Sequence, residues 1–226
     1  MNRNLDFSSH TRMAPRGLDR NLLSKDRLAR ILDISLILLA APYMLLAFLI
    51  IAIAIKIDAP GPVFYRQARI GRSGRKFHVF KFRTMVQNAD QVLQNHLDKS
   101  PQLRAEWITT HKLKQDPRVT RLGSILRKSS LDELPQLYNI LRGEMSLVGP
   151  RPIVDAEIEK YGKCFGFYVQ VRPGLTGLWQ VSGRNDTTYK QRVELDEYYV
   201  RNRGLKLYFQ ILWKTVFVVL RKDGAY

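Results

Sequence analysis

An apolar run at residues 34–55, with the sequence ISLILLAAPYMLLAFLIIAIAI, constrains the fold more than any other feature of the chain. Its length is that of a helix crossing the hydrocarbon core of a bilayer. A cleaved signal peptide is disfavoured, because the apolar core is too long and no disulfide-bearing domain follows it. The run therefore predicts a helix embedded in a membrane, which we place at residues 31–56.

Basic residues flank this run on both sides. They are Arg16, Arg20, Lys25, Arg27 and Arg30 before it, and Lys56, Arg66, Arg69, Arg72, Arg75 and Lys76 after it. Because basic flanks tend to stay in the cytoplasm, a spanning helix would place one cluster on the wrong side. Pro42, within the run, removes a backbone hydrogen bond and bends a helix. A re-entrant helix that bends at Pro42 and returns to the same face accommodates both features, but a spanning helix stays open because proline also occurs there.

The length and composition indicate one domain with anionic partners. No Gly/Ser tract, Pro-rich stretch or repeat marks a linker in the 226 residues, so we expect a flexible basic leader at 1–24 and a single domain at 25–226. The net charge of +17 suits nucleic acid, anionic lipid or phosphorylated small molecules. The single cysteine, Cys164, excludes an internal disulfide, and no histidines are paired at metal-ligand spacing.

Outside the membrane segment, the sequence predicts an α+β fold that is mainly helical. Two aromatic and β-branched runs within 63–85 surround a Gly-containing turn and predict a β-hairpin, and residues 88–114 look helical and charged. In 205–220, polar side chains recur four apart on one face of an otherwise apolar helix. Such a helix suits the membrane interface, with burial in the soluble core as the alternative.

The segments SSLDELPQL and MSLVGPRP combine residues suited to phosphate chemistry. Asp132 and Glu133 are adjacent carboxylates, Arg127 stands shortly before them, and Arg151 lies between two prolines after them. Carboxylates bind Mg2+, and arginine binds phosphate oxygens bidentately. A carboxylate can also attack phosphorus and hold an acyl phosphate. The combination therefore favours an enzyme that acts on phosphate groups.

Plainer interpretations of two segments stay open. Ser130 and Glu133 have the spacing of a capping box, in which both side chains satisfy free N–H groups at a helix start. The Gly-rich segment 172–185, which includes Arg184, either lines a nucleotide pocket or forms ordinary surface turns.

Taken in order, these segments resemble the bacterial sugar transferases that initiate surface polysaccharides, the monotopic phosphoglycosyl transferases. The resemblance is carried by the basic leader, the proline-broken helix, KFRTM, SSLDELPQL, MSLVGPRP, RPGLTGLWQVSGRND and the terminal DGAY. It covers essentially all of residues 25–226 and looks closest to the undecaprenyl-phosphate galactose or glucose phosphotransferases of exopolysaccharide and O-antigen assembly. It implies a re-entrant helix that enters from the cytoplasmic face of the bacterial inner membrane. Many relatives carry Ser-Pro at the helix break, whereas this chain has Ala41 before Pro42.

The resemblance also implies a mechanism. Asp132 would attack the β-phosphate of a UDP-sugar, release UMP and hold the sugar phosphate until undecaprenyl phosphate takes it. Glu133 would place Mg2+ or orient the nucleophile, and the two carboxylates are the implied metal ligands. The implied phosphate and nucleotide contacts are Arg151, Arg127, Arg184 and Lys81.

The expected partners are a UDP-sugar, undecaprenyl phosphate and membrane lipids, and relatives of this kind are often homodimers. Galactose or glucose is the expected sugar, with a UDP-N-acetylhexosamine donor as the alternative. A nucleic-acid partner is not expected, because it would leave the apolar run unexplained. A non-catalytic membrane scaffold is the other alternative, in which Asp132 and Glu133 only cap a helix.

Overall fold

The computed structural model describes residues 20–110, 113, 115–183 and 187–221. Its helices are α1 (Arg20–Asp58), α2 (Ala89–Leu97), α3 (Pro101–Thr110), α4 (Arg121–Lys128), α5 (Gln136–Leu141), α6 (Ile158–Tyr161), α7 (Phe165–Tyr168), α8 (Tyr189–Asn202) and α9 (Leu205–Arg221). Its strands are β1 (Phe64–Ile70), β2 (Lys76–Phe82), β3 (Ser146–Val148) and β4 (Gly174–Thr176). The prediction of a mainly helical α+β fold is confirmed.

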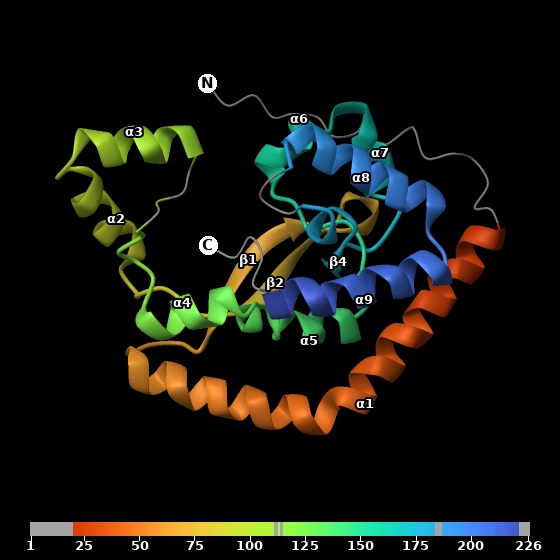
Figure 1. The fold of residues 1–226 in the computed structure, drawn as a ribbon, viewed down its shortest axis with the longest axis horizontal. Helices are drawn as coiled ribbons and strands as arrows, with labels where there is room; N and C mark the ends of the chain where they lie inside the picture. The colour runs from red at the N-terminus through yellow and green to blue at the C-terminus, as the bar shows by residue number, and fades with distance from the viewer. Residues whose placement is uncertain (1–19, 111–112, 114, 184–186, 222–226) are drawn as a thin grey trace.

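Helix α1 contains the predicted membrane segment. It extends beyond residues 31–56 at both ends, so residues 20–24 of the predicted leader are helical. The rest of the predicted leader lies outside the described residues. Pro42 lies inside α1, and the helix axis changes direction about midway along its length (Figure 1). By length and composition, Ser24–Asp58 could cross a membrane.

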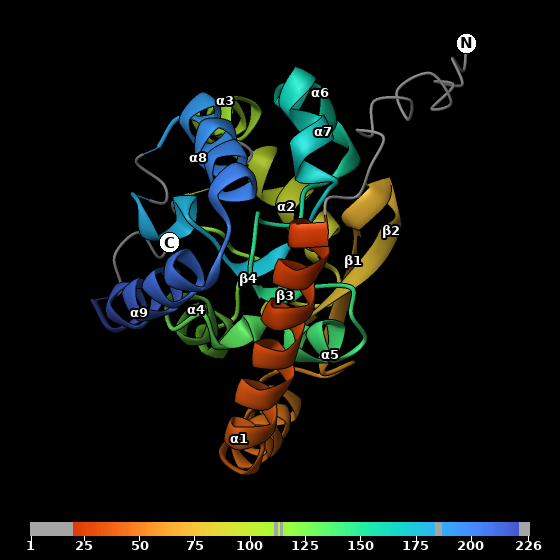
Figure 2. The same ribbon diagram turned by 90° about the vertical axis from the view of Figure 1, so that its right-hand side faces the viewer.

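One face of α1 packs against the rest of the protein. Ile51 and Ile55 are buried with Phe82 of β2 and Leu126 of α4. Nearer the start of the helix, Ile37 packs into a second apolar cluster with Val79 of β2 and Ile140 of α5. Figure 2 shows α1 projecting away from the remainder of the fold, on the side opposite α6 and α8. Most large apolar side chains in the projecting part are exposed, so this helix presents an apolar surface that soluble proteins rarely expose.

Strands β1 and β2 form the predicted antiparallel hairpin, joined by the tight turn Arg72–Gly74. The register places Arg69 opposite Phe77 and Tyr65 opposite Lys81. Because side chains alternate along a strand and directly opposed residues share a face, Arg69 and Lys81 lie on the same face of the hairpin.

A second sheet, formed by the parallel pair β3 and β4, holds two of the sequence motifs side by side. Just after β3, the amide of Gly149 donates to the Thr176 carbonyl of β4 at 2.9 Å, and the amide of Gly174 in β4 donates to the Pro150 carbonyl at 2.8 Å. A Cβ on either glycine would overlap the backbone of the other segment. The close approach therefore needs glycine, and it positions Arg151 immediately after the sheet.

The remaining helices differ from the sequence expectation in one respect. The region 88–114 contains two helices, α2 and α3, because Pro101 begins a new helix after a short break. Helix α9 forms where predicted, with Tyr208 and Ile211 buried and other apolar side chains exposed. The exposed ones are Leu205, Phe209, Trp213, Val216, Phe217 and Leu220.

Candidate active site

The adjacent carboxylates lie in a single 3-10 turn, Leu131–Glu133, between α4 and α5. Ser130, which precedes the turn, has a left-handed backbone with φ 57°, and its side chain makes no capping hydrogen bond. The capping-box interpretation is therefore wrong, because an N-cap serine needs extended backbone to reach the free N–H groups. Thr120 is the residue that caps α4, accepting a hydrogen bond from the Gly123 amide at 2.9 Å.

Glu133 is held by two cations. Lys81 donates to its Oε1 at 2.6 Å, and the Arg151 guanidinium lies 3.5 Å from the same oxygen. Burial alone raises the pKa of Glu133, but Lys81 and Arg151 outweigh it and lower that pKa to about 2. Glu133 is consequently ionised at neutral pH and fixes the Lys81 ammonium within the site.

The pKa of Asp132 is shifted in the opposite direction, upward. Asp132 is 8% exposed, and its carboxylate lies 3.8 Å from the Lys81 ammonium. Burial raises the pKa of Asp132, Glu133 raises it further, and Lys81 and Arg127 only partly offset this. Within the described part of the chain its carboxylate accepts no hydrogen bond, so its oxygens are free for a substrate or a cation.

Arg127 lies beside the carboxylates and is positioned by Thr84. Its Nε donates to the Thr84 hydroxyl at 2.9 Å, and burial lowers the pKa of the guanidinium while Asp132 raises it. The Thr84 carbonyl accepts from the Thr120 amide at 3.1 Å and passes so close to Gly123 that a Cβ there would overlap it. The KFRTM segment and the start of α4 are thus locked together, which fixes the direction of Arg127.

A small hollow adjoins Glu133 and is basic. Its charged lining is Arg69, Lys81, Glu133 and Arg151, with Gln136 at its wall. Arg69 donates to the Pro152 carbonyl at 3.0 Å. Burial and the nearby Arg151 lower the pKa of Arg69. Three cations around one carboxylate make this hollow attractive to a phosphate group.

The structure brings most of the predicted site residues together. Lys81, Asp132, Glu133 and Arg151 form one cluster with Arg127 beside it, whereas Arg184 lies outside the described residues. Sequence reasoning missed Arg69, Thr84 and Gln136 as members of the site. The alternation of the hairpin could have indicated Arg69, because the register puts it on the Lys81 face.

The carboxylates of Asp132 and Glu133 offer the oxygen ligands that Mg2+ prefers. Within the described residues, no three His, Cys, Asp or Glu side chains gather to form a complete protein cage. Mg2+ usually binds through one or two carboxylates, substrate phosphates and waters, so a full cage is not needed. The hydrogen-bond-free carboxylate of Asp132 and its raised pKa fit a nearby cation, which would favour the ionised form.

Comparison with known proteins identifies the class to which this fold and site belong. A family model described as bacterial sugar transferase matches residues 24–222. The chain therefore belongs to the bacterial sugar transferase family, a membrane-associated group, and the resemblance noted from the motifs is confirmed.

Three relatives illustrate the similarity. The chain is 52% identical over 183 residues to the UDP-galactose-lipid carrier transferase of Erwinia amylovora, covering 81% of this chain and 38% of the relative. It is 49% identical over 197 residues to the exopolysaccharide production protein ExoY of Sinorhizobium fredii, covering 87% of each chain. It is 54% identical over 166 residues to the undecaprenyl-phosphate galactose phosphotransferase of Salmonella typhimurium, covering 74% of this chain and 35% of the relative. This chain therefore spans 38% of the Erwinia relative and 35% of the Salmonella relative, but 87% of the Sinorhizobium relative.

Proposed function

We propose that this protein transfers a hexose 1-phosphate from a UDP-sugar to undecaprenyl phosphate with release of UMP. The observation that carries the proposal is the Asp132–Glu133 pair, held among Lys81, Arg127 and Arg151 in a chain of the bacterial sugar transferase family. Relatives named for UDP-galactose and for undecaprenyl-phosphate galactose transfer support galactose, and one named for UDP-glucose supports glucose. The reaction would be the first membrane step of exopolysaccharide, O-antigen or capsule synthesis.

In the first step, a carboxylate oxygen of Asp132 attacks the β-phosphorus of the UDP-sugar. A new P–O bond forms to Asp132, and the bond from that phosphorus to the bridging oxygen breaks, so the electron pair leaves with UMP. The product is an aspartyl phosphosugar in which the sugar C1–O bond is untouched. The absence of competing hydrogen bonds on Asp132 in the described structure suits a nucleophile.

In the second step, a phosphate oxygen of undecaprenyl phosphate attacks the same phosphorus. The aspartyl P–O bond breaks, Asp132 regains its carboxylate, and the lipid carries the sugar on a diphosphate. A covalent intermediate lets a water-soluble donor and a lipid acceptor use one site in turn. Asp132 needs no proton donor in either step, because a phosphate oxygen and a carboxylate carry the charge throughout.

The neighbouring residues position phosphate groups for these steps. Lys81 and Arg151 both contact Oε1 of Glu133, so this carboxylate orients the two cations toward the transferred phosphate and leaves the role of nucleophile to Asp132. Arg127, fixed by Thr84, adds a third cation on the Asp132 side. Together these charges stabilise the negative charge that spreads over the phosphate oxygens during transfer.

Asp132 and Glu133 are the residues that would hold Mg2+. When bound, the ion would neutralise phosphate charge and lower the pKa of the buried Asp132 carboxyl. The raised pKa of Asp132 supports this proposal, because the protein cations only partly compensate the cost of burying its charge.

The membrane arrangement completes the proposal. Helix α1 enters from the cytoplasmic face of the inner membrane, bends at Pro42 and returns, which keeps both basic flanks in the cytoplasm. The exposed apolar face of α9 lies in the interface, with Trp213 among its exposed side chains. In a variant lacking Cys164, single cysteines at Arg27 and Ile57 should then react with an impermeant maleimide from the same side of sealed vesicles. Reaction from opposite sides would establish a spanning helix.

The test of the reaction is UMP release by detergent-purified protein with Mg2+. UDP-galactose, UDP-glucose and UDP-N-acetylhexosamines are each supplied with and without undecaprenyl phosphate. Lipid-dependent UMP from one donor supports the proposal and names the sugar. Asp132→Asn should remove this activity, because an amide cannot form the acyl phosphate. Lys76→Met should retain it, because Lys76 forms only an exposed ion pair with Asp155.

A scaffold without catalysis is the alternative, and it would release no UMP from any donor. Size measurement of the same preparation by light scattering would test the homodimer expected from the resemblance.

A further inference from the structure

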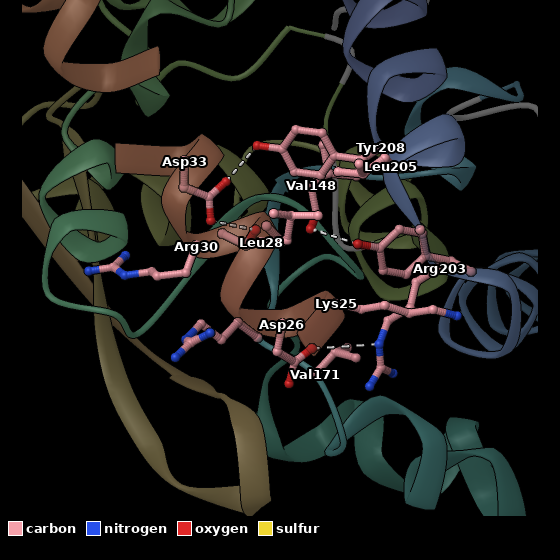
Figure 3. A pocket seen from close by; sticks show the side chains of 15 residues that line it. Lys25, Asp26, Leu28, Arg30, Asp33, Val148, Val171, Arg203, Leu205 and Tyr208 are labelled. Atoms are coloured by element: carbon pink, nitrogen blue, oxygen red, sulfur yellow. Dashed lines mark hydrogen bonds and ion pairs between the residues drawn. The ribbon is translucent and has the colours of Figure 1, made fainter. Parts of the chain in front are cut away.

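A second, larger hollow lies between the first turns of α1 and the junction of α8 and α9 (Figure 3). Its cavity volume is about 60 Å³, room for a few water molecules or one small anion, and the hollow is open at its mouth. Its apolar walls come from Leu28, Val148, Val171, Leu205 and Tyr208 among others. It shares no lining residue with the hollow beside Glu133, so the two are separate sites.

The lining carries more positive than negative charge. Its basic residues are Lys25, Arg30, Arg172 and Arg203, and its acidic residues are Asp26 and Asp33. Both acids are already engaged by the protein. Asp33 accepts hydrogen bonds from the Ser146 hydroxyl at 2.8 Å and the Tyr208 hydroxyl at 2.7 Å, as Figure 3 shows for Tyr208.

Asp26 is likewise committed, because Arg72 lies 2.9 Å from its carboxylate outside the lining. Arg203 forms an ion pair with Asp26 in which its Nε lies 3.6 Å from the carboxylate, too far for a hydrogen bond, and Figure 3 marks this pair with a dashed line. The acids therefore cannot neutralise the four basic residues of the lining.

The Arg203 guanidinium is only partly hydrogen-bonded. Arg203 is 8% exposed; one terminal nitrogen donates to the Val200 carbonyl at 3.3 Å, but the Nε is buried without a hydrogen-bond partner. A buried guanidinium N–H left unpaired is costly, so such a group is expected to meet a ligand or water.

Arg172 adds to the crowding of positive charge. Its Nε donates to the Gly143 carbonyl at 2.9 Å. Burial and the repulsion of Arg72 and Arg30 lower the pKa of Arg172. An anion in the hollow would relieve that repulsion and supply the acceptor that Arg203 lacks.

We propose that this hollow is a second phosphate-binding site, distinct from the Asp132 site, formed by Lys25, Arg172 and Arg203. Its basic residues hold the phosphate oxygens, and the carbon skeleton attached to the phosphate leaves through the open mouth. The site lies at the start of α1, where the apolar membrane segment begins. Two sources share this chemistry: the headgroup of an anionic phospholipid at the membrane surface and a free phosphate compound from the cytosol.

The experiment measures binding to the full chain in neutral detergent micelles. One arm titrates short-chain phosphatidylglycerol against phosphatidylcholine of the same chain length. The other arm titrates inorganic phosphate against chloride at equal ionic strength. The readout in both is the shift of the thermal unfolding midpoint, from which a Kd is fitted for each protein relative to its own ligand-free midpoint.

Two variants and two controls decide the result. Arg203→Gln should raise the Kd about tenfold, the effect of one charge-assisted hydrogen bond, and Asp26 would keep its Arg72 partner in this variant. Lys25→Gln, at an exposed position of the lining, should raise the Kd without disturbing the fold. Arg27→Gln makes the same charge change in the same helical turn, but Arg27 does not line the hollow, so its Kd should match the wild type. Arg151→Gln should bind phosphatidylglycerol normally, because Arg151 belongs to the other site.

Each outcome supports or overturns the proposal independently of the transfer reaction. A shift with phosphatidylglycerol alone, weakened in Arg203→Gln and Lys25→Gln, supports a lipid phosphate. A shift with inorganic phosphate, weakened in the same variants, supports a free phosphate compound. No shift in either arm, or a shift that is equal in Arg27→Gln and Arg203→Gln, overturns it. A shift lost only in Arg151→Gln assigns the binding to the Asp132 site and overturns it as well.

Discussion

Replacing Lys81 by methionine removes the ammonium that connects the two carboxylates of the site. The side chain keeps a similar length and apolar stem, so packing changes little. Glu133 loses its 2.6 Å partner, and Asp132 loses the cation 3.8 Å away. The variant therefore isolates the electrostatic contribution of one buried charge.

The magnitude follows from the pKa of Glu133. A pKa of about 2 in place of 4.5 means that the folded state favours the ionised carboxylate by about 3 kcal/mol, and Lys81 is the largest favourable cause. We expect Lys81→Met to lose about 2 kcal/mol at pH 7, or about 4 to 8 °C in the thermal midpoint. Lys76→Met is the matched control on the same strand, because its 2.8 Å pair with Asp155 is exposed and should contribute less than about 1 kcal/mol.

The pH dependence has a defined sign. A depressed pKa contributes stability that is present above the unfolded value of 4.5 and is lost as the pH falls toward about 2. The deficit of Lys81→Met relative to wild type should therefore be constant from pH 7 to pH 5 and shrink below pH 4.5. Thermal unfolding by circular dichroism in detergent at each pH measures it. A midpoint no lower than that of Lys76→Met, or a deficit that does not shrink at low pH, would refute the electrostatic account of the site.

Three further predictions concern single residues. Asp132→Asn should reduce UMP release to below about one thousandth, yet leave the thermal midpoint unchanged or higher, because the amide removes a buried carboxyl whose pKa is raised; a fall of several degrees would contradict this. Thr84→Val should lower kcat/KM about fivefold, since Arg127 loses its 2.9 Å hydrogen bond, and Thr84→Ser should restore it. Burial is the main cause that raises the pKa of Asp196 to about 7. The wild type should therefore lose stability relative to Asp196→Asn as the pH rises from about 4 to 7. Unfolding curves of both proteins at pH 5 and pH 8 measure this difference in stability.

The elements that local patterns specify were predictable from the sequence. Alternating aromatic and β-branched residues indicated the hairpin, and the apolar run indicated the long helix with Pro42 inside it. The cluster of Lys81 with Asp132, Glu133 and Arg151 came from the family resemblance, and the structure places these residues together.

The features that depend on distant contacts were not predictable. Strands β3 and β4 are three residues each, too short for a periodic signal, and they pair across a long sequence separation. Ser130 has capping-box spacing, but its backbone is left-handed and its side chain makes no capping hydrogen bond, which the spacing does not reveal. Arg69 and Thr84 enter the site through strand register and a hydrogen bond to Arg127, neither of which appears in a linear motif.

The central claim is that Asp132 becomes covalently attached to the sugar phosphate. The most direct measurement is intact-protein and peptide mass spectrometry of the purified chain after rapid acid quenching with UDP-sugar and Mg2+, without undecaprenyl phosphate. The account predicts one added hexose phosphate on the peptide containing Asp132, one equivalent of UMP, and loss of the adduct when undecaprenyl phosphate is supplied. UMP formed only when the lipid is present, with no adduct in wild type at any quench time, would contradict it.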